Sequence, residues 1–382
     1  MTITEANAGE PAQVVWTEEE LLASHAYSEP LVASGVRCHG GFDGDGGYVS
    51  PRTLNRAPAI RAWQAKHERE VGTPLLGLPL DTWPEQYPNV AQARSLIEAG
   101  APEPIISSLT RIGTVEGFGS MIRHSVLPDF NRLFSEGVDG TATDHLDRGL
   151  YEAHARDEAG HEKEAGHKQM WFAARDIAFE NPVTEDDTVL MLERMGIATP
   201  GTGGQIDPER LRAQAIANRI LPDDVPFEFE AVLDRMTRLL LIEISAFHTF
   251  AWAEELLSDT ELVAGDGQAA RLVSYIRTDE TPHVEYLRTV LSEMQARTVV
   301  GTGGRRHAGA DLVGRIWDRA LEQSLGVRRR DGLETTRREV VHALSGRSDA
   351  ADVLARFDEL GSVHRGEDGT WIEAADRAAA TD

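Results

Sequence analysis

Cysteine is almost absent from this chain. The single Cys38 excludes a disulfide within the chain and a cluster of thiolate metal ligands. The N-terminal residues also lack the basic start and apolar stretch of a signal peptide. Both features fit a reducing compartment, so we expect a cytoplasmic protein.

Long apolar runs and an excess of basic residues are missing as well. The most apolar stretch is interrupted by Glu243 and His248, which argues against a membrane span. The chain has 38 Lys and Arg residues against 63 Asp and Glu residues, a net charge of −25. Such a charge repels polyanions. We therefore expect neither membrane nor nucleic acid to be a partner.

The chain has enough apolar residues to form a substantial core, at 41% of its 382 residues. Glycine and proline punctuate its first part, so we expect residues 1–102 to form an irregular arm that packs on a helical body. Residues 103–300 are predicted to form this body. Residues 301–382 are predicted to form a helical extension.

Apolar residues spaced three and four apart predict four long helices in the body. The second and third are joined by a long connection with two short helical pieces, at 186–194 and 208–219. The predicted fold class is all-α, a four-helix bundle with a long crossover. The predicted helices cover 103–128, 144–180, 228–258 and 268–297 in the body, and 310–325 and 332–345 in the extension.

The sequence Asp-Glu-x-x-His occurs twice within predicted helices, as DEAGH at 157–161 and DETPH at 279–283. A Glu and a His three residues apart lie on one face of a helix, about one turn apart. Both side chains can then reach one metal ion. A single Glu-x-x-His is a weak signal, but two copies that share a preceding Asp are a much stronger one.

Two other Glu-x-x-His pairs are set aside, because neither follows an Asp. Glu164, paired with His167, would also lie about 240° around the predicted helix from Glu158 and would face away from the core. Glu339, paired with His342, stands in an Arg-rich segment that is typical of a solvated face.

The positions of residues relative to the turns of two predicted helical hairpins indicate two further Glu residues as candidate metal ligands. Gly137, in a predicted loop, lies midway between Glu116 and Glu158, and a predicted turn likewise lies midway between Glu243 and Glu280. Residues equidistant from a turn lie at the same height in an antiparallel pair of helices. We therefore expect Glu116 opposite Glu158, and Glu243 opposite Glu280.

This set of side chains suits iron or manganese. Its four carboxylates balance two divalent ions, and burying them without metal would be costly. The alternative is a metal-free helical bundle whose polar side chains form ion pairs. The predicted ligands are Glu116, Glu158, His161, Glu243, Glu280 and His283.

On these motifs the chain resembles the ferritin-like di-iron carboxylate superfamily, above all its bacterial multicomponent monooxygenase and ribonucleotide reductase small-subunit branches. The resemblance covers about residues 103–297 and rests on the six ligand positions. It implies that Asp157 and Asp279 accept hydrogen bonds from ligating His residues. His154, one turn before Glu158, is either an extra ligand, as some aryl-amine N-oxygenases of the superfamily have, or a histidine of the core.

The resemblance also implies an enzyme, a non-haem di-iron oxygenase or oxidase that uses dioxygen to oxidise a small organic substrate. Hydroxylation, N-oxygenation and desaturation stay open, and manganese is the alternative at one or both metal positions. An electron donor such as a ferredoxin or a flavin reductase is implied, and a homodimer is left open. No catalytic residue separate from the metal site is predicted. The alternatives are a ferroxidase or iron-storage protein without an organic substrate, and a metal-free scaffold or radical-cofactor subunit.

Three helix-weakening residues stand close to predicted ligands. Gly117 and Gly119, beside Glu116, either leave room for substrate or allow helices to pack closely. Pro282 removes a helical hydrogen bond next to His283, and either opens space there or is a tolerated kink.

Overall fold

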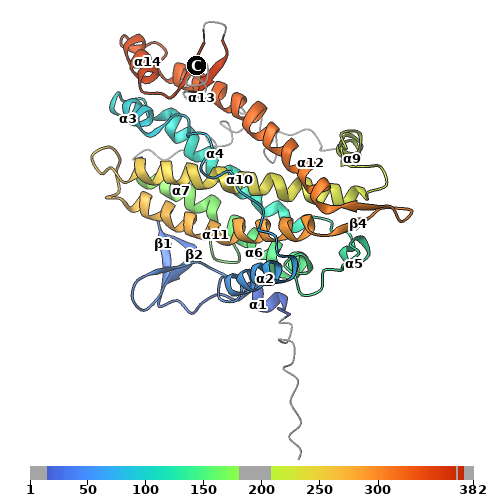
Figure 1. Ribbon diagram of the computed structural model, residues 1–382. Coiled ribbons are helices and arrows are strands. Elements are labelled where there is room, and N and C mark those ends of the chain that lie inside the picture. The colour runs from blue at the N-terminus through green and yellow to red at the C-terminus, as the bar shows by residue number, and fades with distance from the viewer. Residues whose placement is uncertain (1–14, 180–207, 367–368, 374–382) are drawn as a thin grey trace, which may run out of the picture.

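The computed structural model describes residues 15–179, 208–366 and 369–373. Most of these residues are helical and the strands are few and short, so the predicted all-α class is confirmed (Figure 1). Within the described ranges, no helix is both long enough and apolar enough to cross a lipid bilayer. The predicted piece at 186–194 lies outside these ranges, whereas α9 (Pro208–Ala217) falls within the second predicted piece.

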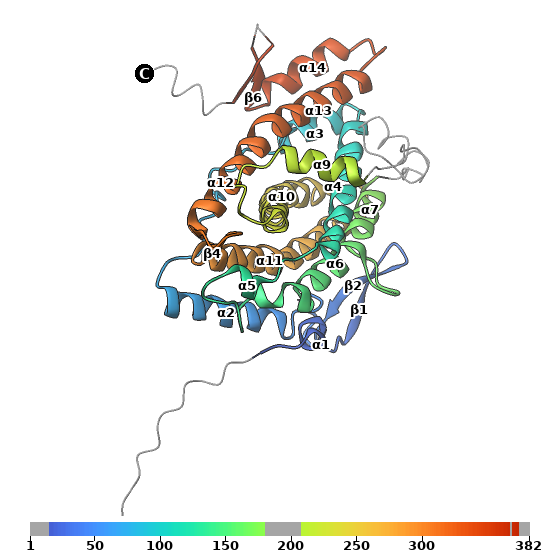
Figure 2. The same ribbon diagram turned by 90° about the vertical axis from the view of Figure 1, so that its right-hand side faces the viewer.

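Five helices form the body around a buried centre. They are α4 (Glu103–Gly119), α6 (Tyr151–Ala159), α7 (His167–Ala178), α10 (Phe227–Leu257) and α11 (Gln268–Gln295). The two long helices, α10 and α11, pack side by side, α4 packs on α6 and α7, and α7 also packs on α11. In the view along α10, α4 and α11 lie on two sides of it (Figure 2).

The inner face of α11 shows how the spacing of apolar residues forms this body. Leu272 and Ile276, one turn apart, are at most 2% exposed, and such burial stabilises the fold by about 1.5–3 kcal/mol for each side chain. Glu280 and His283 continue the same buried face with no exposed surface. The helix runs on through Pro282, so this proline does not end it. The apolar stripe thus holds two polar side chains at the centre of the body.

The predicted helix at 144–180 is wrong in one respect, because a loop divides it into α6 and α7. Gly160, with a φ of 84°, ends α6 in a conformation that favours glycine. The loop then closes on itself through two backbone hydrogen bonds of 2.9 Å between His161 and Glu164. A continuous helix would have carried His161 on the inner face, and the loop carries it outward instead.

A strand of the N-terminal arm pins this loop. The backbone N–H of Ala165 donates to the carbonyl of Arg37, and its carbonyl accepts from the N–H of His39, each at 2.9 Å. Both partners lie on β2 (Val36–Phe42). The pairing joins residues far apart in sequence, so local helical periodicity could not reveal it.

The N-terminal arm is more ordered than the sequence predicts. Its glycines and prolines separate short elements rather than prevent them. Three antiparallel strands form a sheet in the order β1-β2-β3, and α2 packs on α11. The elements are α1 (Glu18–Leu22), β1 (Glu29–Ala33), β2, β3 (Tyr48–Val49), α2 (Arg56–Val71) and α3 (Val90–Glu98).

The C-terminal extension wraps over the body. Its first helix packs on α10 and α11, and a later one packs on α4, so the extension covers the side of the bundle between α10 and α4 (Figure 2). The two predicted helices at 310–325 and 332–345 are joined by a π-helical turn, η4, rather than by a loop. The elements are β4 (Thr298–Val300), β5 (Arg306–Ala308), α12 (Gly309–Glu322), η4 (Gln323–Arg328), α13 (Arg329–Ala343), α14 (Ala350–Glu359), β6 (Val363–Arg365) and β7 (Trp371–Glu373).

Short helical turns connect α4 to α6. This connection runs from Ser120, after the end of α4, to Leu150, before the start of α6. These elements are η1 (Ser120–His124), α5 (Phe130–Leu133), η2 (Thr143–His145) and η3 (Leu146–Leu150).

Candidate metal centre

Seven His and Glu side chains from the five helices of the body converge at its centre. Each is at most 5% exposed. They form two groups, and within each group the potential ligand atoms lie within 4.8 Å of one another. The seven residues are Glu116, His154, Glu158, His167, Glu243, Glu280 and His283.

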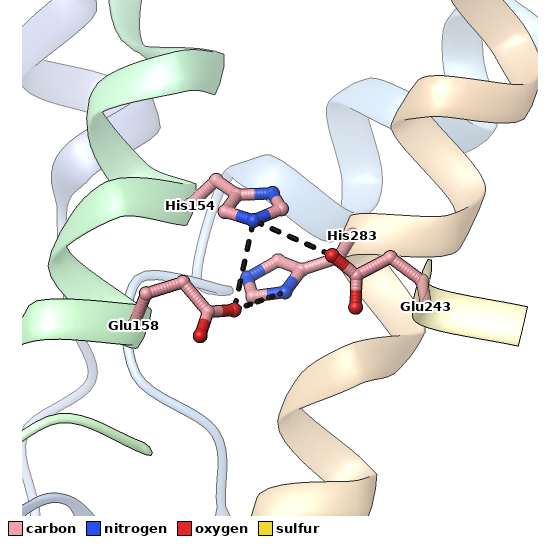
Figure 3. Close-up of side chains that lie close together, drawn as sticks. All are labelled: His154, Glu158, Glu243 and His283. Carbon is pink, nitrogen blue, oxygen red and sulfur yellow. Dashed lines mark ion pairs between the residues drawn. The ribbon is translucent and has the colours of Figure 1, made fainter. Parts of the chain in front are cut away.

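The first group joins α6, α10 and α11 (Figure 3). Nε2 of His154 lies 3.5 Å from Oε1 of Glu158 and 3.5 Å from Oε1 of Glu243. Nδ1 of His283 lies 3.4 Å from the same Oε1 of Glu158. Two imidazoles and two carboxylates therefore point at one small volume.

The second group joins α4, α6, α7 and α11. Nδ1 of His167 lies 2.8 Å from Oε1 of Glu280, 3.4 Å from Oε1 of Glu158 and 3.6 Å from Oε2 of Glu116. Glu158 belongs to both groups, so its carboxylate lies between them. Oε2 of Glu280 also reaches Nδ1 of His283, at 2.7 Å, and links the groups a second time.

His161 is not part of this centre, contrary to the sequence prediction. Its side chain is 39% exposed and lies 3.8 Å from Glu162 on the loop after α6. His167, the first residue of α7, occupies the position that His161 was expected to fill. Without residues 160–165, His167 would follow Glu158 at the expected spacing of three. Gly160 and Gly166 stand at the two ends of this loop, and they were the sequence signal that could have predicted the break in the helix.

Asp157 holds the outer nitrogen of His283. Nε2 of His283 donates to Oδ2 of Asp157 at 3.0 Å, which directs Nδ1 at the carboxylates. Asp157 also binds Arg52, and it accepts a hydrogen bond of 2.8 Å from Arg56. Burial would raise the pKa of Asp157, but the two guanidinium groups hold it well below its usual range. The carboxylate therefore stays charged and fixes the imidazole in place.

Asp279 has the equivalent position behind His167. Its Oδ2 lies 3.5 Å from Nε2 of His167 and 2.8 Å from Nε2 of His39. The hydroxyl of Tyr48 donates to the same carboxylate at 2.7 Å. His39 and Tyr48 come from the sheet of the N-terminal arm, so that arm helps to position the centre.

His154 is oriented by an aromatic hydroxyl. Its Nδ1 lies 3.1 Å from the hydroxyl of Tyr286, and its ring stacks on that of His283 with centroids 3.8 Å apart. Nε2 is therefore left to face the carboxylates. The structure places His154 among the potential ligands rather than behind them.

The charges of the centre explain why its acids behave differently from one another. Burial, and then the neighbouring carboxylates, raise the pKa of Glu116 and of Glu243 well above the usual range. Burial would also raise the pKa of Glu280, but the charges of His167 and His283 lower it well below the usual range. Several acids thus share a buried volume, where a cation would be strongly stabilised.

The spacing of these atoms fits a metal ion. A first-row transition metal holds N and O ligands at about 2.1 Å, which puts neighbouring ligand atoms about 3.0–3.5 Å apart. The separations around His154 and His167 are close to this range. Among the described residues, Oε2 of Glu116, Nε2 of His154 and Nδ1 of His167 also have no hydrogen-bond partner of good geometry. A bound ion would satisfy these buried atoms.

Gly119 allows α4 to approach Glu158. A Cβ atom at this position would lie 2.8 Å from Cγ and 3.0 Å from Cδ of Glu158. A Cβ at Gly117 would meet the flexible side chain of Lys168, whose Cδ lies 2.9 Å away. The sequence left two roles open for these glycines, room for substrate or close packing of helices. Gly119 has the second role, because it lies directly against a potential ligand.

A cavity of about 1120 Å³ leads from the centre to the surface, and it is lined by residues of α4, α9, α10 and α12. Its lining includes three of the potential ligands, Glu116, Glu158 and Glu243. A second cavity of about 520 Å³, under α13, also reaches Glu116. The centre is thus buried but accessible to a small molecule.

Comparison of this chain with protein-family models, with curated proteins and with solved structures finds no match. Function is therefore inferred from the geometry and chemistry of the site alone.

Proposed function

We propose that this protein is a non-haem di-iron oxygenase or oxidase that uses dioxygen to oxidise a small organic substrate. The observation that supports it is the convergence of three His and four Glu side chains, all buried, beside a cavity that opens to solvent. Helices α4, α6 with α7, α10 and α11 would then be the four helices of a ferritin-like bundle.

The proposal assigns each metal ion to one group of residues. His154, Glu243 and His283 would hold one ion, and Glu116, His167 and Glu280 the other, with Glu158 between them. Iron bound there would supply the oxidising power when it reacts with dioxygen. Imidazole and carboxylate ligands suit iron, and manganese is the alternative.

The chain's own residues would orient the ligands. Asp157 would fix the direction of His283 through the hydrogen bond that it accepts from Nε2, and Asp279 would face Nε2 of His167 as an ion-pair partner at 3.5 Å. Because the ligand side chains are buried, a substrate would reach the centre through the cavity. Electrons would come from an external donor such as a ferredoxin or a flavin reductase.

The cavity favours this function over ferroxidase activity. A volume of about 1120 Å³ exceeds what an iron ion needs and lies just above the range of about 300–1,000 Å³ that is usual for small-molecule sites. A ferroxidase requires only a path for ions, so the apolar walls of the cavity would have no role in it.

The test is anaerobic titration of the full chain with Fe(II), followed by Mössbauer spectroscopy and exposure to dioxygen. We expect two iron ions per chain with a coupled di-iron signal, and consumption of dioxygen without growth of a mineral core. His161→Ala, on the outer loop, should behave as wild type in each measurement. Binding of no iron would overturn the proposal, and formation of a mineral core would favour ferroxidase activity instead.

A further inference from the structure

The mouth of the large cavity carries an arginine that the proposed metal chemistry does not use. Arg235 of α10 lines the cavity eight residues before Glu243, which places it about 12 Å nearer the end of the helix. One of its N–H groups donates to Oγ of Ser125 at 2.7 Å, which orients the guanidinium. Among the described residues, no carboxylate forms an ion pair with Arg235.

The acidic residues near Arg235 do not neutralise its positive charge. Asp234, the acid next to it, already binds Arg238 at 2.7 Å and Arg319 at 2.9 Å. Glu230, the other acid of this wall, forms an ion pair of 2.9 Å with Arg219. The wall at the mouth is therefore locally positive, although the whole chain carries a net charge of −25.

Between this mouth and the ligands the walls are apolar. Val115 of α4 and Leu239 and Ile242 of α10 line the cavity on the way to Glu243. At the rim, Phe118 is 53% exposed, so an aromatic side chain stands beside the opening. The route is thus cationic at one end, apolar in the middle and lined by potential metal ligands at the other end.

We propose that the substrate is a small carboxylic acid with an apolar body, held by Arg235 through its carboxylate. Guanidinium binds carboxylate through two parallel hydrogen bonds, which fixes both position and direction. The apolar body would then lie along Leu239 and Ile242, and its far end would reach the metals. This inference depends on the proposed function, because the metal centre defines the reacting end.

The test uses the full chain loaded with Zn(II), which does not react with dioxygen. Octanoate and 4-phenylbutyrate serve as probes, and 1-octanol and 4-phenylbutanol are their neutral counterparts. Dissociation constants are measured by calorimetry for wild type, Arg235→Gln, Arg235→Lys and Arg271→Gln. Arg271 is a matched control, since it is exposed on α11 nine residues before Glu280 and away from the cavity lining.

We expect at least one acid to bind wild type more tightly than its alcohol. Arg235→Gln should weaken that acid about 10- to 100-fold, the range for a lost charge-assisted contact, and leave the alcohol unchanged. Arg235→Lys should restore part of the loss, and Arg271→Gln should match wild type. Metal content and circular dichroism of each variant establish that it is folded and loaded.

Two results would overturn the inference. One is that neither acid binds wild type, and the other is that a bound acid keeps its affinity in folded Arg235→Gln, as it would if its carboxylate bound the metals. Failure of the proposed function gives a different result, because wild type would then take up fewer than two metal ions or consume no dioxygen with iron, whatever its affinity for the acids.

Discussion

Oδ2 of Asp157 lies 3.0 Å from Nε2 of His283, and the same carboxylate binds the buried Arg52 and Arg56. Replacement of Asp157 by Ala leaves both arginines buried without their partner. We expect Asp157→Ala to lower the free energy of unfolding by about 3–5 kcal/mol. Urea unfolding of the metal-free proteins measures this.

Asp318→Asn, on the exposed face of α12, is the control and should change stability by no more than about 0.5 kcal/mol. A loss of less than about 1 kcal/mol in Asp157→Ala would show that the two arginines find other partners. The measurement is made without metal so that weaker metal binding does not add to the loss.

Alanine substitutions distinguish which of the two histidines after Glu158, His161 or His167, binds metal. His167 lies 2.8 Å from Glu280, whereas the side chain of His161 is 39% exposed. We expect His167→Ala to bind one metal ion fewer per chain, or to bind it at least about tenfold more weakly. His161→Ala should bind as wild type does. Anaerobic Fe(II) titration with elemental analysis measures metal binding by both variants. Weaker binding by His161→Ala than by His167→Ala would favour the predicted continuous helix instead.

A methyl group at Gly119 should disturb the centre from outside it. Its Cβ would lie 2.8 Å from Cγ of Glu158, closer than such atoms approach, so the carboxylate must shift. We expect Gly119→Ala to reduce metal affinity about tenfold or more. The control is Gly314→Ala in α12, where a Cβ meets nothing within 4 Å and should stabilise the helix by about 0.5–1 kcal/mol. Equal metal affinity in both variants would contradict the close contact.

Removal of metal should destabilise the whole fold. The centre buries four carboxylates, among them Glu116 and Glu243, whose pKa values burial raises well above the usual range. A metal that binds only the folded chain adds about 2.7 kcal/mol at a hundred times its dissociation constant. We therefore expect Tm to fall on chelation and to rise with added Fe(II) under anaerobic conditions. A Tm that is the same in chelator and in Fe(II) would argue for a metal-free core.

The one thiol should be unreactive in the folded chain. Cys38 is 1% exposed, and burial raises its pKa to about 11, with the charge of Asp279 acting in the same direction. At pH 8 the thiolate fraction is therefore about 100-fold lower than for a thiol at its ordinary value. We expect reaction with Ellman's reagent to be very slow in buffer and fast in 6 M guanidinium chloride. A fast reaction in buffer would show that β2 opens readily.

Local sequence pattern was sufficient for much of the body. Leu272, Ile276, Glu280 and His283 follow helical spacing, and the structure buries all of them on one face of α11. Register from the hairpin turns likewise placed Glu116 near Glu158. The first relation depends on the 3.6-residue turn of a helix, and the second on the equal number of residues on either side of the connection between two helices.

The tertiary structure alone decided the rest. Ala165 pairs with β2, and this contact carries His161 outward and starts α7 at His167. Arg56 and Tyr48 reach the centre from an arm in which the sequence predicts no regular elements. The spacing of residues along one helix determined which side chains could share a face. Contacts between segments far apart in the chain determined which of them meet, because those contacts set where a helix breaks and what packs behind it.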